Sequence, residues 1–491
     1  MLSVLLVVAH NNYKQKVSSM STSREHFSSK IGFILAAAGS AVGIGNLVGF
    51  PVAATKNGGG AFLIIYALFV AFICLPVMLA EMGLGRRAQH SPYKAYAELG
   101  QDTKRWRIAG WLATITPFMI AVFYMVITVW IFGYLFQTLS GNLDLIAQPD
   151  YFGQFVNDYS FVGYLVAVTV IINFILVGGV RKGIERASKI LMPTLFLMLV
   201  LLVIFVLTLD NAMAGVEFYL VPDFSKIDGS VINGALAQAF FSLSLGMGIL
   251  ITYGSYFRRS DDIVTSGKLV AITDTAVAFT AGLMTLPAIF AIYPDTNPES
   301  LSDSSVSMIF SFFPQIFMQL SDIVGYGFAT VAAAIFFLLA FVAAITSLVS
   351  IIEVPTSSFM ERHNVSRKKA LLAMGFAITL LTLLAATSFG LLPWVSNVAH
   401  YAGVDKSLFD IIVDVFYDTI LPLNGLLICL FVRFRWKRSN FAAELSEGNP
   451  NYQTSWLHKY VDFSIGTFIP VILAVIFANT VATKFFGTSF L

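Results

Sequence analysis

The chain has 491 residues, of which 57% are hydrophobic and 12% are charged, and its net charge at pH 7 is +2. Because soluble domains carry about 25% charged residues, this composition and a mean hydropathy of +0.79 exclude a soluble globular protein and indicate a polytopic, all-α membrane protein. Its two cysteines, Cys74 and Cys429, lie in apolar segments, which argues against a disulfide framework or a thiolate metal site.

The chain opens with a tail over residues 1–30, which we expect to be cytoplasmic. Residues 1–10 carry a short apolar run that no basic region precedes, and the run is too short to span a bilayer. Met20 stands just ahead of a polar stretch and is a candidate physiological start. We therefore interpret residues 1–20 as a disordered or artefactual extension.

Eleven apolar segments follow, each long enough to cross a membrane as a helix. They lie near residues 31–55, 60–85, 108–138, 160–179, 190–209, 232–257, 269–292, 323–352, 370–388, 409–432 and 460–483. With a cytoplasmic N-terminus, 26 of the 30 Lys and Arg residues fall on the inner side. The positive-inside rule thus predicts a multi-pass protein of the cell inner (plasma) membrane, with its C-terminus extracytoplasmic. The lysines on the outer side are Lys56, Lys226, Lys406 and Lys484.

The first predicted span contains an unusual stretch. Residues 36–51 include Gly39, Gly43, Gly45, Asn46 and Pro51, which disfavour a continuous helix. A broken helix leaves carbonyl groups without partners, so in lipid it persists only inside protein or beside a polar cavity. We interpret the stretch as a binding site. The alternative is that its glycines allow close helix packing.

The sixth predicted span has a similar stretch at residues 238–248, where two glycines and two serines interrupt apolar residues. Spans 1 and 6 correspond if the first ten spans form two inverted repeats of five, at 31–209 and 210–434. Residues 435–491 then supply a cytoplasmic loop and span 11. Matching interruptions in two such repeats are typical of a transport site at mid-membrane. On the outer side, residues 294–321 fit either a hairpin of short helices that acts as a lid or an ordinary interfacial loop.

Long, ordered motifs from residue 24 to about residue 420 resemble the neurotransmitter:sodium symporter family, of the prokaryotic amino-acid transporter type. They include REHF at 24–27, GSAVGIGN at 39–46, NGGGAF at 57–62, FSLSLG at 241–246 and AAITS at 343–347. The resemblance implies the LeuT fold, with 11 transmembrane helices, 5+5 inverted repeats, and helices 1 and 6 broken at mid-membrane.

The resemblance also implies two Na⁺ sites made of the oxygen ligands that a hard cation prefers. The first implied site consists of Ala41, Asn46, Ser242 and Asp274. The second consists of Gly39, Val42, Ala343, Thr346 and Ser347. By itself, a Thr-Ser pair more simply donates back to carbonyls of its own helix.

Asp274 departs from the asparagine that is common in the family. A carboxylate near mid-membrane costs about 2.5–3.5 kcal/mol on insertion scales, so it should have a partner cation. Its fixed negative charge would replace the chloride that some members use, and Ala278, four residues on, lacks a hydroxyl or carboxylate. We predict chloride-independent transport. The alternatives are a protonated, structural Asp274, and an Asp274 that returns a proton after sodium release.

The implied substrate site lies between the two interruptions. Backbone N–H groups near Ala41 and Gly45, with the Tyr124 hydroxyl, suit a carboxylate. Gly43 stands where amine-carrying members place an aspartate, which favours a substrate that brings its own carboxylate. The apolar residues of the set favour a neutral, hydrophobic amino acid. The full set is Ala41, Gly43, Gly45, Ile120, Tyr124, Phe241, Ser242, Ser244, Met247, Ser347 and Ile351.

Two gates are implied as well. Outside, Phe241 and Tyr124 would form an apolar lid, with Gln238 and Asp414 above it. The arginine that usually pairs with this acid is replaced by Gly49, so we expect Asp414 to pair elsewhere or to be solvated. The implied inner gate consists of Arg24, Tyr256 and Glu361.

These residues predict a symporter that couples Na⁺, as two ions, to the import of a neutral amino acid by alternating access. A proton-coupled carrier and a non-transporting amino-acid sensor of the same fold are the alternatives. An enzyme is not expected, because the six histidines lie mostly in tails and loops and have no metal-site spacing. The expected partners are the substrate and the lipid bilayer, without nucleic acid, and the oligomeric state is not predicted.

Overall fold

The computed structural model describes residues 25–292, 294, 306 and 308–490, and nearly all of its elements are helices. The α-helices are α2 Lys30–Ala41, α3 Phe50–Lys56, α4 Gly60–Phe69, α5 Leu75–Ala88, α6 Pro92–Leu99, α7 Lys104–Leu139, α8 Leu143–Ile146, α9 Tyr151–Val156, α10 Phe161–Val177, α11 Arg186–Val206, α12 Ala212–Leu220, α13 Gly229–Ser242, α14 Ile249–Gly254, α15 Ile263–Ile292, α17 Phe313–Val324, α18 Tyr326–His363, α19 Arg367–Ala386, α20 Pro393–Ser396, α21 Leu408–Ile412, α22 Leu421–Phe431, α23 Arg438–Ser446, α24 Trp456–Gly466 and α25 Phe468–Phe486.

Shorter turns of π and 3-10 helix connect or extend these helices. The π-helices are η1 Gly45–Gly49, η2 Val70–Cys74, η3 Val180–Glu185, η6 Met308–Phe312, η8 Val413–Ile420 and η9 Val432–Trp436, and the 3-10 helices are η4 Phe224–Lys226 and η7 Thr387–Phe389. One antiparallel hairpin pairs β1 Ala399–Tyr401 with β2 Val404–Lys406, in the register Ala399↔Lys406.

Within the described residues, eight helices are long and apolar enough to cross a membrane, and a pair bent by 55° makes a ninth. Three further apolar helices, Phe161–Val177, Val231–Ser242 and Met308–Val324, are shorter. The predicted class, a helical protein with many apolar spans, is confirmed. The count of eleven stays a prediction, because the segments predicted as spans 4 and 6 hold two of these shorter helices.

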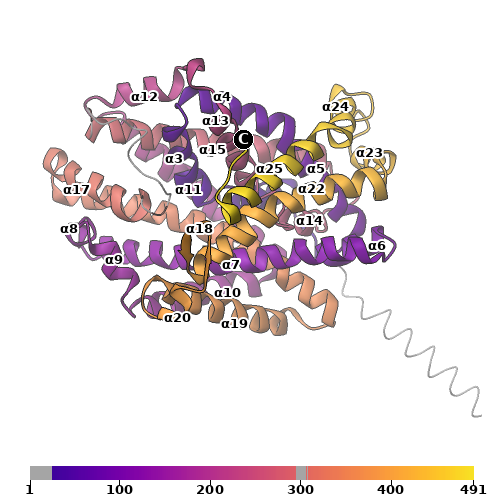
Figure 1. Cartoon of the computed structure of the whole chain (residues 1–491), viewed down its shortest axis with the longest axis horizontal. Coiled ribbons are helices and arrows are strands. Elements are labelled where there is room, and N and C mark those ends of the chain that lie inside the picture. Colours follow the sequence, from indigo (N-terminus) through magenta and orange to yellow (C-terminus); the bar gives the residue numbers. More distant parts are fainter. Residues whose placement is uncertain (1–24, 293, 295–305, 307, 491) are drawn as a thin grey trace, which may run out of the picture.

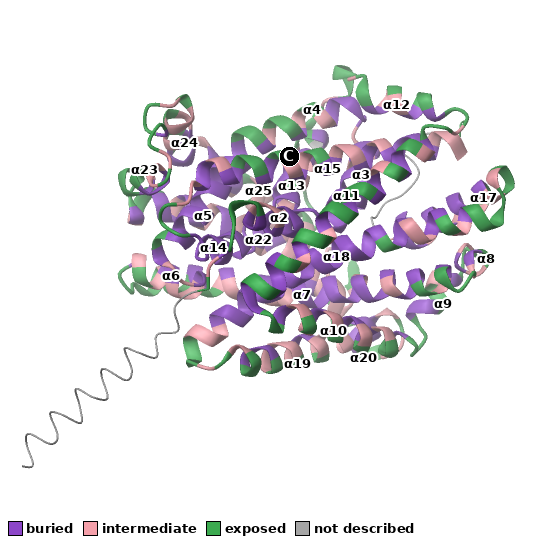
Figure 2. Ribbon diagram, turned by 180° about the vertical axis from the view of Figure 1, so that it is seen from behind, coloured by how far each residue is buried: buried purple, intermediate pink, exposed green. Residues whose placement is uncertain are grey.

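The core is built around α7 and α18, helices of 36 and 38 residues that pack along each other (Figure 1). Helix α2 packs against α18, α11 and α15, and its residues 36–38 are alanines that are at most 1% exposed. Such small side chains let neighbouring helix backbones approach closely. Figure 2 shows α2, α14 and the middle of α18 as buried, whereas α10, α11 and α19 present exposed faces.

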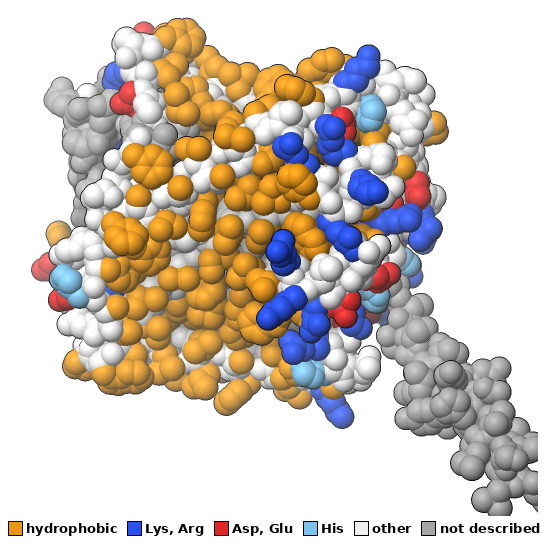
Figure 3. Space-filling view, turned by 45° about the vertical axis from the view of Figure 1, so that its right-hand side comes forward, with side chains coloured by type: hydrophobic (Ala, Val, Ile, Leu, Met, Phe, Trp, Pro, Cys, Tyr) orange, Lys and Arg blue, Asp and Glu red, His pale blue; other side chains and the backbone are white. Residues whose placement is uncertain are grey.

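The outer surface suits a bilayer. Large apolar side chains point outward, among them Phe174 (85% exposed), Leu372 (74%) and Phe376 (72%). Figure 3 shows hydrophobic side chains covering the middle of one face, while Lys and Arg side chains gather at one end of it.

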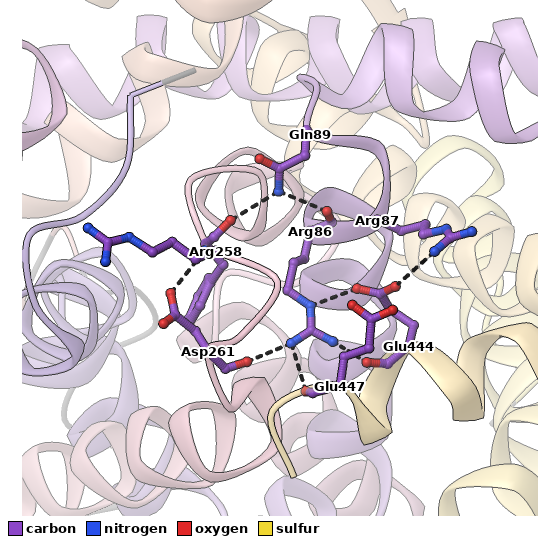
Figure 4. Close-up of polar contacts among 8 residues, drawn as sticks. Arg86, Arg87, Gln89, Arg258, Asp261, Glu444 and Glu447 are labelled. Atoms are coloured by element: carbon purple, nitrogen blue, oxygen red, sulfur yellow. Dashed lines mark hydrogen bonds and ion pairs between the residues drawn. The ribbon is translucent and has the colours of Figure 1, made fainter. Parts of the chain in front are cut away.

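A buried arginine ties helices together near α23. Arg86, at the end of α5, is fully buried. Its Nε donates to Glu444 Oε1 (2.6 Å), and its Nη1 donates to Asp261 O (2.6 Å) and to Glu447 O (3.0 Å) (Figure 4). Its Nη2 also donates to the Glu444 carbonyl. One side chain thus joins α5 to α23 and to the loop before α15.

Candidate functional site

The first interruption separates α2 from η1. Val42 has an extended backbone (φ −73°, ψ 94°), and the helix resumes at Ile44 with a bend of 55°. Side chains accept from the N–H groups near the bend: Gly43 N donates to Asn46 Oδ1 (3.2 Å), and Ile44 N donates to the Tyr124 hydroxyl (3.2 Å). These groups are thus paired although they lie outside a regular helix.

The second interruption separates α13 from α14. Ser244, Gly246 and Gly248 have positive φ angles of 53°, 77° and 67°. Such angles end the helix, and the two glycines adopt them readily. Glu81 Oε1 accepts from Gly246 N (2.8 Å), and Asn424 Nδ2 donates to Gly246 O (2.8 Å). Side chains from α5 and α22 therefore satisfy backbone groups of this buried turn that lie outside a regular helix.

Three hydrogen bonds hold the two interruptions together. They run from Gln238 Nε2 to Gly45 O (2.9 Å), from Ser244 Oγ to Ser40 O (3.1 Å) and from Asn46 Nδ2 to Ser242 Oγ (3.0 Å). Each joins positions 193 to 204 residues apart in the sequence, so the tertiary fold brings the two stretches face to face.

Asp274, fully buried in α15, is surrounded by neutral donors. Asn46 Nδ2 donates to its Oδ1 (2.7 Å), and Ser242 Oγ (2.7 Å) and the Tyr66 hydroxyl (3.3 Å) donate to its Oδ2. The structure brings together three of the four residues assigned to the first Na⁺ site, while Ala41 lines the adjacent space. A carboxylate with amide, hydroxyl and carbonyl groups around it is a donor set that fits Na⁺.

The residues assigned to the second Na⁺ site lie where α2 meets α18. Ser347 Oγ lies 3.4 Å from both Gly39 O and Val42 O. Thr346 Oγ1 donates to two earlier carbonyls of its own helix, at 3.0 Å (Ala343) and 3.1 Å, so it makes the back-bond of an ordinary helical hydroxyl. The set supplies carbonyl and hydroxyl oxygens without formal charge, which also suit Na⁺.

A small space lies between the interruptions. Its volume is about 10 Å³, roughly that of one water molecule, so an amino acid fits only after the walls move. Ile120 and Ser242 are buried but do not line it, and Ser242 faces Asp274 instead. The assigned substrate residues that line it are Ala41, Gly43, Gly45, Tyr124, Phe241, Ser244, Met247, Ser347 and Ile351.

Phe241 separates this space from a second cavity of about 400 Å³, which is lined by residues of α13, η8, α22 and α25. The ring of Phe241 meets the ring of Tyr417 edge to face, with centroids 4.6 Å apart. Gln238 also lines the larger cavity. Phe241 and Tyr417 thus stand at the boundary between the closed site and the wider cavity.

Asp414, assigned to the outer gate, pairs elsewhere rather than being solvated. It is 4% exposed and contacts Lys406 Nζ (2.9 Å) and Lys484 Nζ (3.2 Å), and the Tyr401 hydroxyl donates to it (2.9 Å). Both cations come from the four lysines predicted on the outer side.

Two of the three inner-gate residues, Tyr256 and Glu361, lie within the described part of the chain. Arg24 lies outside the described residues. The Tyr256 hydroxyl donates to Glu353 Oε1 (2.6 Å), and Glu361 accepts from the backbone N (3.0 Å) and the hydroxyl (2.8 Å) of Ser91.

Comparisons with known proteins identify the family. The model of the sodium:neurotransmitter symporter family matches residues 24–148 and 153–485. The chain belongs to this family. Relatives include the uncharacterized sodium-dependent transporter YhdH of Bacillus subtilis, 33% identical over 93% of this chain and 97% of its own length. A second, from Haemophilus influenzae, is 32% identical over 93% and 98%.

A solved structure also shares the fold. The structure of MhsT in complex with L-phenylalanine matches with a TM-score of 0.79 and 36% identity, over 93% of this chain and 99% of that one. As a sodium:neurotransmitter symporter, the chain belongs to a family of Na⁺-dependent membrane transporters, not of enzymes. The resemblance predicted from the motifs is confirmed.

Several buried polar residues near the two interruptions and at the inner gate lie outside the sequence motifs. Glu81 and Glu353 are acids inside apolar runs, which is itself a signal of a functional site in a membrane span. Glu353 is fully buried and pairs with Arg367 Nη2 (2.5 Å). Tyr66 and Asn424 gave no such signal, because both are uncharged and neither lies in one of the motifs.

Proposed function

We propose that this chain is a Na⁺-coupled symporter that imports a neutral, hydrophobic amino acid by alternating access, with two Na⁺ ions and without chloride. The observation that carries the proposal is the meeting of two interrupted helices around one small closed space. Ser347 lines this space, and Asp274 contacts Asn46 and Ser242 of the two interrupted stretches. The complex of the related MhsT with L-phenylalanine supports an amino acid as the substrate.

The architecture that we propose has eleven spans. Residues 31–209 and 210–434 form inverted repeats, with spans 1 and 6 broken at mid-membrane. Of the outer hairpin predicted at 294–321, residues 295–305 and 307 lie outside the described residues. Residues 1–30 and the loop at the start of 435–491 are cytoplasmic, and span 11 ends outside the cell. The gathering of Lys and Arg at one end of the surface supports this orientation (Figure 3), because basic residues are retained on the cytoplasmic side.

Coupling follows from the donor set. The substrate carboxylate would itself be a ligand of the Na⁺ held by Asn46, Ser242 and Asp274, so each of the two binds more tightly when the other is present. The Tyr124 hydroxyl, which accepts from Ile44 N, also has a proton to donate to that carboxylate. Bound together, Na⁺ and substrate shift the population between outward-open and inward-open states.

Thermal unfolding of the purified protein tests this function. Each of the twenty amino acids is added in Na⁺ or in K⁺, since a ligand of the folded state raises stability by mass action. We expect hydrophobic amino acids such as phenylalanine to raise the unfolding temperature in Na⁺ and not in K⁺. Stabilisation that is equal in both salts contradicts the proposal and favours a proton-coupled carrier.

Binding alone does not distinguish a transporter from a sensor of the same fold. Purified protein in liposomes, with Na⁺ outside and labelled phenylalanine, separates the two. We expect accumulation of the label; Na⁺-dependent binding without accumulation would identify a sensor.

A further inference from the structure

A lysine of α25 bridges two acids of η8. Lys484 Nζ lies 2.7 Å from Asp418 Oδ2 and 3.2 Å from Asp414 Oδ1. The two acids are four residues apart on one helix, where like charges repel. Lys406 also pairs with Asp414. Among the described residues, Lys484 is the cation that pairs with Asp418.

The bridge stands beside the route to the candidate site. Asp418 follows Tyr417, whose ring contacts Phe241. Lys484, Asp418, Tyr417 and Phe241 all line the cavity of about 400 Å³, and Phe241 also lines the closed space. The bridge and the contact between Tyr417 and Phe241 therefore face the same cavity, next to the candidate site.

The segment after the first interruption lacks the arginine that usually pairs with the outer-gate acid in the family. Residue 49, directly before Phe50 and Pro51, is glycine. Helix α25 instead runs beside α22 (Figure 1), with which it is in contact. The positive charge facing η8 thus comes from a different element.

We propose that Lys484 is the closing residue at the outer end of this transporter. Its bridge to Asp414 and Asp418 holds η8 and Tyr417 against Phe241 in the closed state, and the bridge breaks when the larger cavity opens onto the site. This inference rests on the proposed function, because closing and opening are steps of alternating access.

The charged groups of the bridge are partly shielded from solvent. The side chain of Asp414 is 6% exposed, that of Asp418 is 21% exposed and that of Lys484 is 38% exposed. An exposed ion pair contributes little to stability, whereas removing one partner of a largely buried pair leaves the other charge without compensation. Loss of Lys484 should therefore shift the population towards the open state.

A single introduced cysteine can report this shift. The native Cys74 and Cys429 are buried. Ser40 lines the closed space, and its hydroxyl has no hydrogen-bond partner in the structure, so Ser40→Cys leaves the polar contacts of the described residues intact. A charged methanethiosulfonate reagent should label the introduced thiol of the purified full-length protein only when the site opens.

In this background we compare Lys484→Gln with Lys406→Gln, which removes a cation from Asp414 and leaves Asp418 paired. In Na⁺ with phenylalanine, we expect labelling at least fivefold faster in Lys484→Gln and less than twofold faster in Lys406→Gln. Lys484→Arg should keep the original rate. Asp418→Asn removes the same ion pair without leaving an acid unpaired, and it should also speed labelling even if Lys484→Gln fails to fold.

The outcomes separate the two hypotheses. If Na⁺ and phenylalanine protect the introduced thiol equally with and without Lys484, or if Asp418→Asn labels at the original rate, the closing role is wrong and the proposed function stands. If Na⁺ and phenylalanine neither protect the Ser40→Cys protein nor raise the unfolding temperature of the unsubstituted protein, the proposed function fails, and the closing role fails with it.

Discussion

Asp274 is a buried carboxyl group whose hydrogen-bond partners are neutral groups. Its three donors are an amide and two hydroxyls, from Asn46, Ser242 and Tyr66. In a low-dielectric interior, hydrogen bonds from neutral groups offset only part of the cost of an unpaired carboxylate. A mobile cation at this position would supply the missing charge, so Asp274 should set the affinity for Na⁺ and make chloride unnecessary.

Replacing this carboxylate tests that role. Asp274→Asn removes the charge and keeps the shape of the side chain. We expect the Na⁺ concentration that gives half-maximal stabilisation by phenylalanine to rise at least about tenfold, which corresponds to about 1.4 kcal/mol. Asp405→Asn is the control, because Asp405 is 65% exposed and pairs with His400. An unchanged Na⁺ dependence in Asp274→Asn contradicts the assignment.

Gly43 is tested by adding a single methyl group. A Cβ at this position would lie 2.6 Å from both Ser347 Oγ and the Tyr124 hydroxyl, so it needs room that the substrate site does not have. We expect Gly43→Ala to abolish the stabilisation by phenylalanine. Gly163→Ala is the matched control, since its Cβ meets nothing within 4 Å. Binding by Gly43→Ala at the original affinity would show that the substrate lies elsewhere.

At the scale of elements, α5 and α23 depend on one buried ion pair. Glu444 is 3% exposed, and removing one partner of a buried pair costs about 3–5 kcal/mol. We expect Arg86→Gln to lower the thermal stability clearly. The neighbouring Arg87→Gln should have little effect, because Arg87 is 44% exposed and lies 3.9 Å from Glu444. Equal stability of the two variants would contradict this account of Figure 4.

The elements also show what the sequence can and cannot predict. The points where α2 and α13 end fall within the two glycine-rich stretches, 36–51 and 238–248, because backbone preference is local. The side chains that satisfy those turns come from elsewhere. Glu81 reaches Gly246 across 165 positions, and Asn424 reaches it across 178. Such partners depend on the packing of whole helices, which composition does not reveal.

Charged contacts were harder still to predict than the helix ends. The sequence places Asp414 near the outer gate but leaves its partner open between another cation and water. Lys484 becomes that partner only because α25 packs against α22 and η8. In the same way, Tyr256 bonds to Glu353, which no motif singled out.

At the scale of the whole molecule, the distribution of Lys and Arg sets the orientation that we propose. Ser260 and Ser140 are exposed and lie in loops at the predicted inner and outer sides. In intact cells, an impermeant thiol reagent should label Ser140→Cys and spare Ser260→Cys until the membrane is permeabilised. Labelling in the reverse pattern would invert the topology.

We propose that the two interrupted helices bind Na⁺ and an amino acid together and carry them across the membrane. The most direct measurement is the uptake of labelled phenylalanine into liposomes that hold the purified protein, driven by a Na⁺ gradient. Chloride is replaced by gluconate in one set, and a pH gradient replaces Na⁺ in another. We predict accumulation that needs the Na⁺ gradient and persists in gluconate. Accumulation without Na⁺ under the pH gradient, or none in any condition with any hydrophobic amino acid, would contradict the account.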